Sequence, residues 1–243
     1  MTKLSANRIG LVLGFGLALG TLDASASVVE RSVRVGNTDL HYKLVLPEGY
    51  DAAKAYPGII VLGGGPQTME VVDRTLERNF RPEAERRGYI VIAPAAPGGE
   101  LFFEGGERIF PEFLKTVLTY YKITDGKFHI AGPSNGGIAA LHVAALNPDY
   151  FLSVTAFPGY MWEPSNKKLL AISKMCVYFY VGENDEYRWH DEMKREAEFL
   201  SSHGAVAKYS VEKGQPHRIE TLAGASASRL FDGFEAVKNG CSR

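Results

Sequence analysis

The sequence Gly-Pro-Ser-Asn-Gly at residues 132–136 lies between a β-prone run at 128–131 and an Ala/Leu-rich run that ends at Leu146. This order predicts a strand, a sharp turn and a helix. A Gly-x-Ser-x-Gly turn in that position is typical of a nucleophilic serine, because the turn exposes the hydroxyl at the end of the strand. The glycines leave no Cβ between strand and helix, and the first N–H groups of the helix carry partial positive charge. We therefore predict that Ser134 is a nucleophile; the alternative is a glycine-rich loop with an incidental serine.

A second motif follows a later apolar, β-rich run at 176–181, where the sequence continues Gly-Glu-Asn-Asp at 182–185. In hydrolases built on such a serine turn, the acid follows the nucleophile along the chain on a loop after a later strand. Asp185 is the predicted acid, and Glu183 and Glu186 are its local rivals. The alternative role of Asp185 is to cap the N-terminus of the next helix.

The third motif, Gly-Gln-Pro-His at 214–217, follows a short predicted strand at 208–211. His217 is the predicted base: one ring nitrogen accepts the Ser134 proton, while Asp185 holds the other N–H and stabilises the imidazolium. The remaining histidines are predicted to be packed or surface groups, and they are His41, His129, His142, His190 and His203.

Donors for an oxyanion are expected from the glycine-rich loop at 63–67, together with the N–H of Asn135. Glycine lets backbone N–H groups come close to a developing negative charge. Gly65 is the favoured donor in this loop, with Gly64 or Gln67 as alternatives. The loop is neither a phosphate-binding nor a dinucleotide-binding motif, because no Gly-Lys-Ser/Thr follows it and no G-x-G-x-x-G opens a helix there.

These motifs, in this order, resemble the α/β-hydrolase fold superfamily of serine hydrolases. The sequence Ser-Asn-Gly-Gly at 134–137 and the sequence Asn-Pro-Asp-Tyr-Phe at 147–151 are similar to feruloyl esterases and polyhydroxybutyrate depolymerase-like proteins, and more loosely to dienelactone hydrolase-like proteins. The resemblance covers about residues 30–240 and implies eight strands with the first pair antiparallel. Two departures stand out: Gly-Gly at 63–64 replaces the His-Gly of many relatives, and Ser134 replaces the cysteine nucleophile of dienelactone hydrolases.

Apolar strand runs alternate with helical runs along the whole chain after an antiparallel hairpin. This alternation predicts an α/β fold, with a mostly parallel eight-stranded sheet that carries helices on both faces. The expected strands are 33–35, 40–46, 58–62, 89–93, 128–131, 152–157, 176–181 and 208–211, and the expected helices are 69–87 with a break at Pro82, 110–121, 136–146, 187–203 and 219–238. A single domain at 27–243 is expected, since the chain has no repeat.

The first 26 residues have the pattern of a secretory signal peptide. Lys3 and Arg8 precede an apolar core at 9–19, and Ala-Ser-Ala at 24–26 fits a cleavage site. Because this core is too short to span a bilayer, we predict cleavage, no membrane anchor, and export to the periplasm or the exterior. Removal takes the net charge from −1 to −2, and this near-neutral balance argues against a nucleic-acid partner.

Substrate contacts are expected from the loops that leave the carboxyl ends of the parallel strands. The candidates are Gln67, Phe102, Phe103, Tyr160, Trp162 and Tyr187, although aromatic residues there can equally seal loops over the core. No insertion is long enough for a lid domain, which favours small soluble esters.

The preferred function is a carboxylic ester hydrolase. A prolyl oligopeptidase-type serine peptidase for small peptides is the alternative, and a non-catalytic binding module is the third possibility. No metal or cofactor is expected, because H-E-x-x-H and paired C-x-x-C motifs are absent, and the sequence indicates no oligomeric state.

The two cysteines are predicted to form a disulfide. The helix expected at 219–238 begins near His217 at the carboxyl edge of the sheet and runs back to the opposite edge, where Cys241 follows it. Cys176 opens a strand at that same edge, and export to an oxidising compartment makes a bridge plausible. Two unpaired thiols are the alternative.

Overall fold

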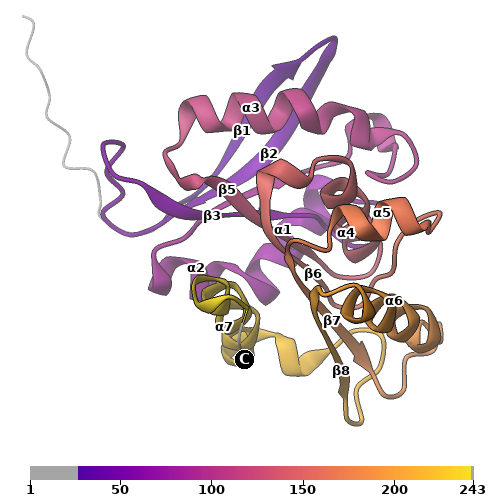
Figure 1. Ribbon diagram of the computed structural model, residues 1–243. Helices are drawn as coiled ribbons and strands as arrows, with labels where there is room; N and C mark the ends of the chain where they lie inside the picture. Colours follow the sequence, from indigo (N-terminus) through magenta and orange to yellow (C-terminus); the bar gives the residue numbers. More distant parts are fainter. Residues whose placement is uncertain (1–26, 242–243) are drawn as a thin grey trace, which may run out of the picture.

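A single mixed sheet forms the centre of the computed structural model, which describes residues 27–241 (Figure 1). Its strands are β1 (Ser27–Val35), β2 (Thr38–Leu46), β3 (Tyr56–Val61), β4 (Ile90–Pro94), β5 (Ile123–Gly132), β6 (Phe151–Ala156), β7 (Cys176–Gly182) and β8 (Val206–Glu212), in the order β1-β2-β4-β3-β5-β6-β7-β8. β2 pairs antiparallel with β1 and β4, and the other neighbours are parallel. The predicted eight-stranded, mostly parallel sheet is confirmed; the predicted signal peptide at 1–26 lies outside the described residues.

Helices cover both faces of this sheet (Figure 1). Side chains of α3 (Phe110–Tyr120), α4 (Asn135–Leu146), α5 (Asn166–Ala171) and α6 (His190–Ser202) join one buried cluster, and those of α1 (Met69–Asn79), α2 (Arg81–Arg87) and α7 (Ser228–Ala236) join the other. Within β3, Ile60 belongs to the first cluster and Ile59 and Val61 to the second, because successive side chains of a strand point to opposite faces. None of the helices described is long and apolar enough to cross a membrane.

The helix that follows Ser134 is the most deeply packed one. Every residue of α4 from Gly136 to Ala145 is buried, and its glycines and alanines let the helix lie close to β5 and β6. Its N-terminus is therefore fixed against the carboxyl edge of the sheet, where ligands bind in folds of this kind.

The helix expected at 219–238 is a correction. The structure has two short 3₁₀ segments, Glu220–Leu222 and Gly224–Ala227, before the nine-residue helix α7. Ala223 has extended backbone and Gly224 has a φ of +56°, so a continuous helix is interrupted there. In a continuous helix the Leu222 carbonyl would accept a hydrogen bond from a backbone N–H of the next turn. Here it accepts instead from Asn79 Nδ2 of α1, at 2.7 Å.

Two smaller differences concern other helices. The break expected at Pro82 falls at Phe80, whose buried side chain and φ of −130° separate α1 from α2, while Pro82 lies in the first turn of α2. α5 was not expected at all, because it is only six residues long; Ser165 caps it by accepting from the Lys168 N–H. Neither change alters the sheet.

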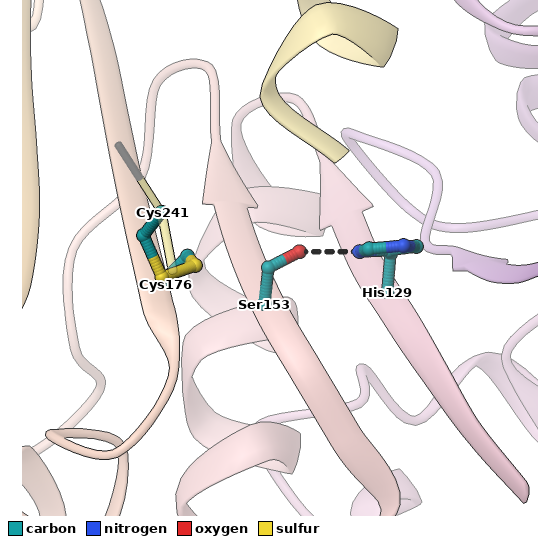
Figure 2. Close-up of a disulfide and its surroundings, with 4 residues drawn as sticks. All are labelled: His129, Ser153, Cys176 and Cys241. Carbon is teal, nitrogen blue, oxygen red and sulfur yellow. Dashed lines mark hydrogen bonds between the residues drawn. A yellow bond between two sulfur atoms is a disulfide. The ribbon is translucent and has the colours of Figure 1, made fainter. Parts of the chain in front are cut away.

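The predicted disulfide is confirmed. Cys176 at the start of β7 is bonded to Cys241, with Cα atoms 5.6 Å apart and a sequence separation of 65. Figure 2 shows the bridge near a second pair of side chains in neighbouring strands, where His129 Nδ1 lies 2.7 Å from Ser153 Oγ. Burial lowers the pKa of His129 to about 3, so this histidine is a packed neutral group, as predicted from its place within a strand.

Candidate active site

Ser134 occupies a strained turn between β5 and α4, with φ 54° and ψ −126°. The turn is possible because the residues two positions before and after Ser134 are glycines and lack side chains. A Cβ on Gly132 would lie 2.5 Å from the Gly136 backbone, and a Cβ on Gly136 would lie 2.1 Å from the Leu62 carbonyl oxygen. Side-chain-free residues at both positions thus bring strand, turn and helix into contact and leave the Ser134 hydroxyl at the carboxyl edge of the sheet.

The three predicted catalytic side chains meet there in one hydrogen-bonded chain. Ser134 Oγ lies 2.9 Å from His217 Nε2, and His217 Nδ1 lies 3.1 Å from Asp185 Oδ1. The Asp185 side chain is fully buried, and Oδ1 also accepts from the Tyr187 N–H at 2.9 Å. In the tautomer that fits these contacts, His217 donates from Nδ1 to the carboxylate and accepts the Ser134 proton at Nε2.

The loop that carries the base is tied to the loop that carries the acid. Glu186 Oε2 accepts from the His217 N–H at 3.0 Å, and Glu183 Oε2 accepts from the Gly214 N–H at 2.7 Å. The bonds that Glu186 accepts from backbone N–H groups lower its pKa. Glu183 and Glu186, the two rivals of Asp185 as the acid, therefore bind backbone N–H groups of the loop that carries His217, and neither of them bonds to the His217 imidazole.

The glycine-rich loop lies against the serine turn, as the oxyanion prediction requires. Asn135 Nδ2 donates to the Gly65 carbonyl at 2.9 Å, and a Cβ on Gly64 would lie 3.1 Å from the Pro133 carbonyl oxygen. The structure thus brings Gly64, Gly65 and Asn135 together around Ser134. The N–H of Asn135 is at the first turn of α4, where backbone N–H groups lack partners within the helix.

Gln67 is a correction, both as an alternative donor and as a substrate contact. Its backbone N–H donates to the Gly64 carbonyl at 3.1 Å, and its side chain is completely buried. Gln67 Oε1 accepts from the Phe102 N–H at 2.8 Å, and Nε2 donates to the Asn135 carbonyl at 3.4 Å. The Gln67 side chain therefore links the loop at 63–67 to Phe102 and Asn135, and both its amide oxygen and its amide nitrogen already have hydrogen-bond partners.

Two of the predicted aromatic contacts are core residues. Phe102 is fully buried and packs edge to face on Phe110, and Phe103 packs on Trp162 with ring centres 5.0 Å apart. They close the loop after β4 over the core, and neither Phe102, Phe103 nor Trp162 lines the cavity at Ser134. The sequence left both roles open, because an aromatic residue that seals a loop looks the same as one that lines a pocket, and for Phe102 and Phe103 the structure shows the sealing role.

The other aromatic residues lie beside the base. The Tyr187 ring centre is 4.5 Å from that of His217, and the Trp189 ring centre is 4.8 Å from it. Tyr160 packs edge to face on Trp189. All three line a cavity of about 710 Å³. Tyr187 thus contacts His217 directly, whereas Tyr160 reaches it only through Trp189.

A buried carboxyl group fixes the loop that bears Tyr160. Glu196 of α6 accepts from the Met161 N–H at 2.9 and 3.0 Å through its two oxygens. Burial raises the pKa of Glu196 to about 7. Sequence analysis did not find this residue, since a glutamate within an amphipathic helix normally faces solvent.

A second, smaller cavity is lined by Ser134 and His217. Its volume is about 270 Å³, and one of its walls is α1, which starts directly after the oxyanion loop. Sequence analysis missed this wall, although the residues at i and i+4 after such a loop lie on one face of a helix. The side chains contributed by α1 are Val71, Arg74, Thr75, Arg78 and Asn79.

No group of three or more His, Cys, Asp or Glu side chains that could hold a metal ion occurs within residues 27–241. The groups that meet at the site are the side chains of Ser134, His217 and Asp185 and the backbone N–H groups around them. A serine, an imidazole that accepts its proton and a buried carboxylate constitute the arrangement that acyl transfer to serine requires.

Comparison with known proteins gives a family match and similar folds. The Esterase family model matches residues 103–232, just over half of the chain. An S-formylglutathione hydrolase from Agrobacterium tumefaciens has a TM-score of 0.62 at 15% identity and covers 89% of this chain and 95% of its own. A feruloyl esterase module from Clostridium thermocellum, complexed with sinapinate, has a TM-score of 0.61 at 15% identity and covers 81% of this chain and 83% of its own.

Two peptidases are also similar over part of their length. A dipeptidyl-peptidase 5 of Emericella nidulans is 36% identical over 61 residues, which are 25% of this chain and 8% of that protein. A dipeptidyl aminopeptidase IV structure from Bacteroides ovatus has a TM-score of 0.66 at 14% identity, covering 88% of this chain but 36% of that one. This chain thus spans about a third or less of either peptidase.

Proposed function

Because this chain belongs to the Esterase family of α/β-hydrolases, we propose that it cleaves carboxylic esters with Ser134, His217 and Asp185 as its catalytic triad. The observation that carries the proposal is the continuous contact from Ser134 Oγ to His217 Nε2, at 2.9 Å, and from His217 Nδ1 to Asp185 Oδ1, at 3.1 Å. The three residues follow β5, β7 and β8, which end at the same edge of the sheet.

In the acylation step, Ser134 Oγ attacks the ester carbonyl carbon while His217 Nε2 takes the hydroxyl proton. The electron pair of the carbonyl moves to its oxygen, and the N–H groups of Asn135 and Gly65 stabilise that oxyanion. When the tetrahedral intermediate collapses, the bond to the alcohol oxygen breaks and His217 returns the proton to this leaving group. Asp185 stays ionised and stabilises the imidazolium.

In the deacylation step, a water molecule replaces the alcohol. His217 removes a proton from the water as its oxygen attacks the acyl carbon, and the same N–H groups hold the second oxyanion. Collapse breaks the bond to Ser134 Oγ, which regains its proton from His217. The products are an acid and an alcohol, and the enzyme returns to its starting state.

A second candidate is a serine peptidase that acts on small peptides. The 61-residue similarity to a dipeptidyl-peptidase favours it, and the same triad would attack an amide. An amide differs from an ester in its leaving group, since the amine nitrogen has to be protonated before it departs. Esters and amides with the same acyl part therefore separate the two candidates.

We also propose that the protein works outside the cytoplasm. The disulfide between Cys176 and Cys241 supports an oxidising compartment, in line with the predicted signal peptide. Expression of the full chain in a bacterium with a periplasm tests this proposal: mass spectrometry of the periplasmic protein should give a chain that lacks residues 1–26. Retention of the intact chain in the cytoplasm would contradict it.

The function is tested with purified protein and a panel of 4-nitrophenyl esters of short and long acids, hydroxycinnamate esters and aminoacyl 4-nitroanilides. A fluorophosphonate probe, which reacts with activated serines, is used in parallel and its site is found by peptide mass spectrometry. We expect ester hydrolysis and labelling at Ser134. Labelling with amide cleavage alone would favour the peptidase, and absence of both labelling and turnover would refute the proposed triad.

A further inference from the structure

The small cavity at Ser134 has an unusual distribution of charge. Three arginines line it: Arg74 and Arg78 from α1, and Arg218 directly after the base. No aspartate or glutamate among the described residues lines it with them. The chain as a whole has a net charge of −1, so this cluster does not follow from a generally basic surface.

The carboxylates that pair with these arginines do not cancel their charge. Arg74 pairs with Glu70, whose side chain is 81% exposed. Arg78 and Arg218 share a single partner, because Glu220 lies 2.8 Å from Arg78 and 3.7 Å from Arg218. Three guanidinium groups thus share two carboxylates, which leaves one unbalanced positive charge at the cavity, and water screens the exposed partners strongly.

The larger cavity on the other side of His217 provides an internal comparison. It is also lined by two arginines, Arg188 and Arg195, but two acidic side chains, Glu192 and Glu196, line it as well, and Glu192 Oε1 lies 3.1 Å from Arg195 Nη2. The positive bias is therefore a property of the α1 side of the site.

The α1-side cavity combines this charge with an apolar floor. Val71, Phe157 and Pro158 line it together with the arginines, and its volume of about 270 Å³ suits a short hydrocarbon chain with a small polar end. Arg78 is held in place, because its guanidinium also donates to the Ile219 carbonyl at 3.2 Å. Arg74 and Arg218 are more than half exposed and pair with glutamates that are themselves exposed; guanidinium groups bind carboxylates in pairs of parallel hydrogen bonds.

We propose that the preferred ester of this enzyme carries a carboxylate, separated from the ester bond by a short apolar spacer, and that Arg74 and Arg218 attract this group into the α1-side cavity. The proposal rests on the proposed function and specifies its substrate class: half-esters of short dicarboxylic acids, or esters of short hydroxy acids. In either case the carboxylate takes no part in the bonds that are made and broken at Ser134.

The experiment compares substrates that differ only in this charge. On the acyl side, the 4-nitrophenyl half-ester of adipic acid is compared with the 4-nitrophenyl ester of adipic acid monoamide. On the alcohol side, 3-acetoxybenzoate is compared with 3-acetoxybenzamide. For the wild-type protein at low ionic strength, we expect kcat/KM for the anionic member of at least one pair to exceed that for its amide by about tenfold or more. The pair that shows the effect tells which side of the ester occupies the cavity.

Two substitutions and a matched control connect the effect to the arginines. Arg74→Gln and Arg218→Gln should each lower the anion-to-amide ratio of kcat/KM by about threefold to tenfold, and the double variant should bring it close to one. Arg34→Gln should leave the ratio unchanged: Arg34 is also exposed and ion-paired, with Asp39 at 2.8 Å, but it lies in the β1–β2 hairpin. Arg78 is not substituted, because its loss would also free the Ile219 carbonyl.

Ionic strength gives a second readout. Raising it from about 0.01 M to about 0.15 M shortens the Debye length from about 30 Å to about 8 Å. The wild-type ratio should therefore fall, and the ratio of the double variant should not. A wild-type ratio of one or below in both pairs, or a ratio that survives in the double variant, would overturn the proposal and leave Arg74 and Arg218 as members of surface ion pairs.

Failure of the proposed function is recognised separately. If neither member of either pair is hydrolysed, the esterase proposal fails, and the anion site is then measured by calorimetric binding of adipate and of adipic acid monoamide to the Ser134→Ala protein. Tighter binding of adipate that Arg74→Gln weakens would support the anion site without esterase activity. Equal binding of the two would refute the anion site as well.

Discussion

At the scale of single residues, strain and burial determine what the Ser134 site can do. A non-glycine residue with φ 54° and ψ −126° costs on the order of 1–3 kcal/mol, which the burial of α4 offsets. Asp185 is constrained by burial: its Oδ2 is buried and has no hydrogen-bond partner among the described residues. The negative charge of this carboxylate is therefore directed to the Nδ1–H of His217.

The first prediction concerns the nucleophile and the base. Ser134→Ala and His217→Ala should each lower kcat by about 10³-fold or more, and the double variant should be no worse, because the two side chains act as one unit. Stopped assays with the best ester measure this, and circular dichroism checks the fold. Ser173→Ala, which changes an exposed serine of the α5–β7 connection, is the control and should keep full activity.

Asp185→Asn belongs to the same prediction and should be milder yet severe. The amide oxygen can still face His217, but the negative charge is lost and the wrong tautomer of the imidazole becomes favourable. We expect kcat to fall while the melting temperature stays near that of the wild type. Unchanged kcat in this variant would identify another residue as the acid.

At the scale of elements, glycine in α4 has a steric function that glycine in α7 lacks. A Cβ on Gly136 would meet the Leu62 carbonyl oxygen at 2.1 Å, whereas a Cβ on Gly233 would meet the Tyr178 ring at an ordinary 3.7 Å. Gly136→Ala should therefore cost about 1–3 kcal/mol or more and displace the serine turn. Gly233→Ala should be neutral or stabilise the helix by up to about 1 kcal/mol. Urea unfolding of both variants, with activity of the folded fraction, measures the difference.

The connection between α6 and the Tyr160 loop predicts a dependence of stability on pH. Burial raises the pKa of Glu196 from 4.5 to about 7, so the folded protein holds a proton that the unfolded chain releases. The stability contributed by this proton is complete below about pH 4.5 and is lost as the pH rises to about 7, by on the order of 3 kcal/mol. Glu196→Gln keeps an oxygen for the Met161 N–H and should remove this loss.

The measurement compares the free energy of unfolding of variant and wild type at each pH, because other groups titrate too. His129, with its pKa lowered to about 3 by burial, changes stability in the opposite direction over part of this range. Glu192→Gln is the control, since Glu192 lines the same cavity but has an exposed side chain. If wild type and Glu196→Gln differ by the same amount at pH 4.5 and pH 7.5, the buried proton is absent.

A feature of the fold or of the site could be predicted from the sequence when the residues that cause it lie within a few positions of one another. Ser134 was predictable because the glycines that permit its turn lie within two residues of it, and Asp185 and His217 because each directly follows a strand. The wall formed by Arg74 depends on how α1 lies over the turn, which no short pattern encodes. The final helix was overpredicted for the same reason: it begins only at Ser228, and Asn79, from a distant element, bonds to the Leu222 carbonyl in the segment before it.

At the scale of the whole molecule, the disulfide and the proposed catalytic residues lie at opposite ends of the parallel strands. Cys176 opens β7, and Asp185 follows the end of the same strand. Cys241→Ala should therefore lower the free energy of unfolding by about 4 kcal/mol, the chain-entropy value for a loop of this length, with little change in kcat. Guanidinium unfolding of the variant and of reduced wild type measures the effect. Equal stability of oxidised and reduced wild type would show that the bridge contributes nothing.

The same bridge encloses a defined portion of the chain. The loop from Cys176 to Cys241 contains Asp185 and His217, whereas Ser134 lies outside it. A protease that nicks the exposed turn at Gly204, between α6 and β8, would divide the polypeptide into two fragments, and the base would then belong to a different fragment from the nucleophile. Because the sulfur–sulfur bond still joins those fragments, a nicked molecule keeps its mass on a gel without reductant and can retain its activity, whereas a thiol reductant would release the fragment that carries His217.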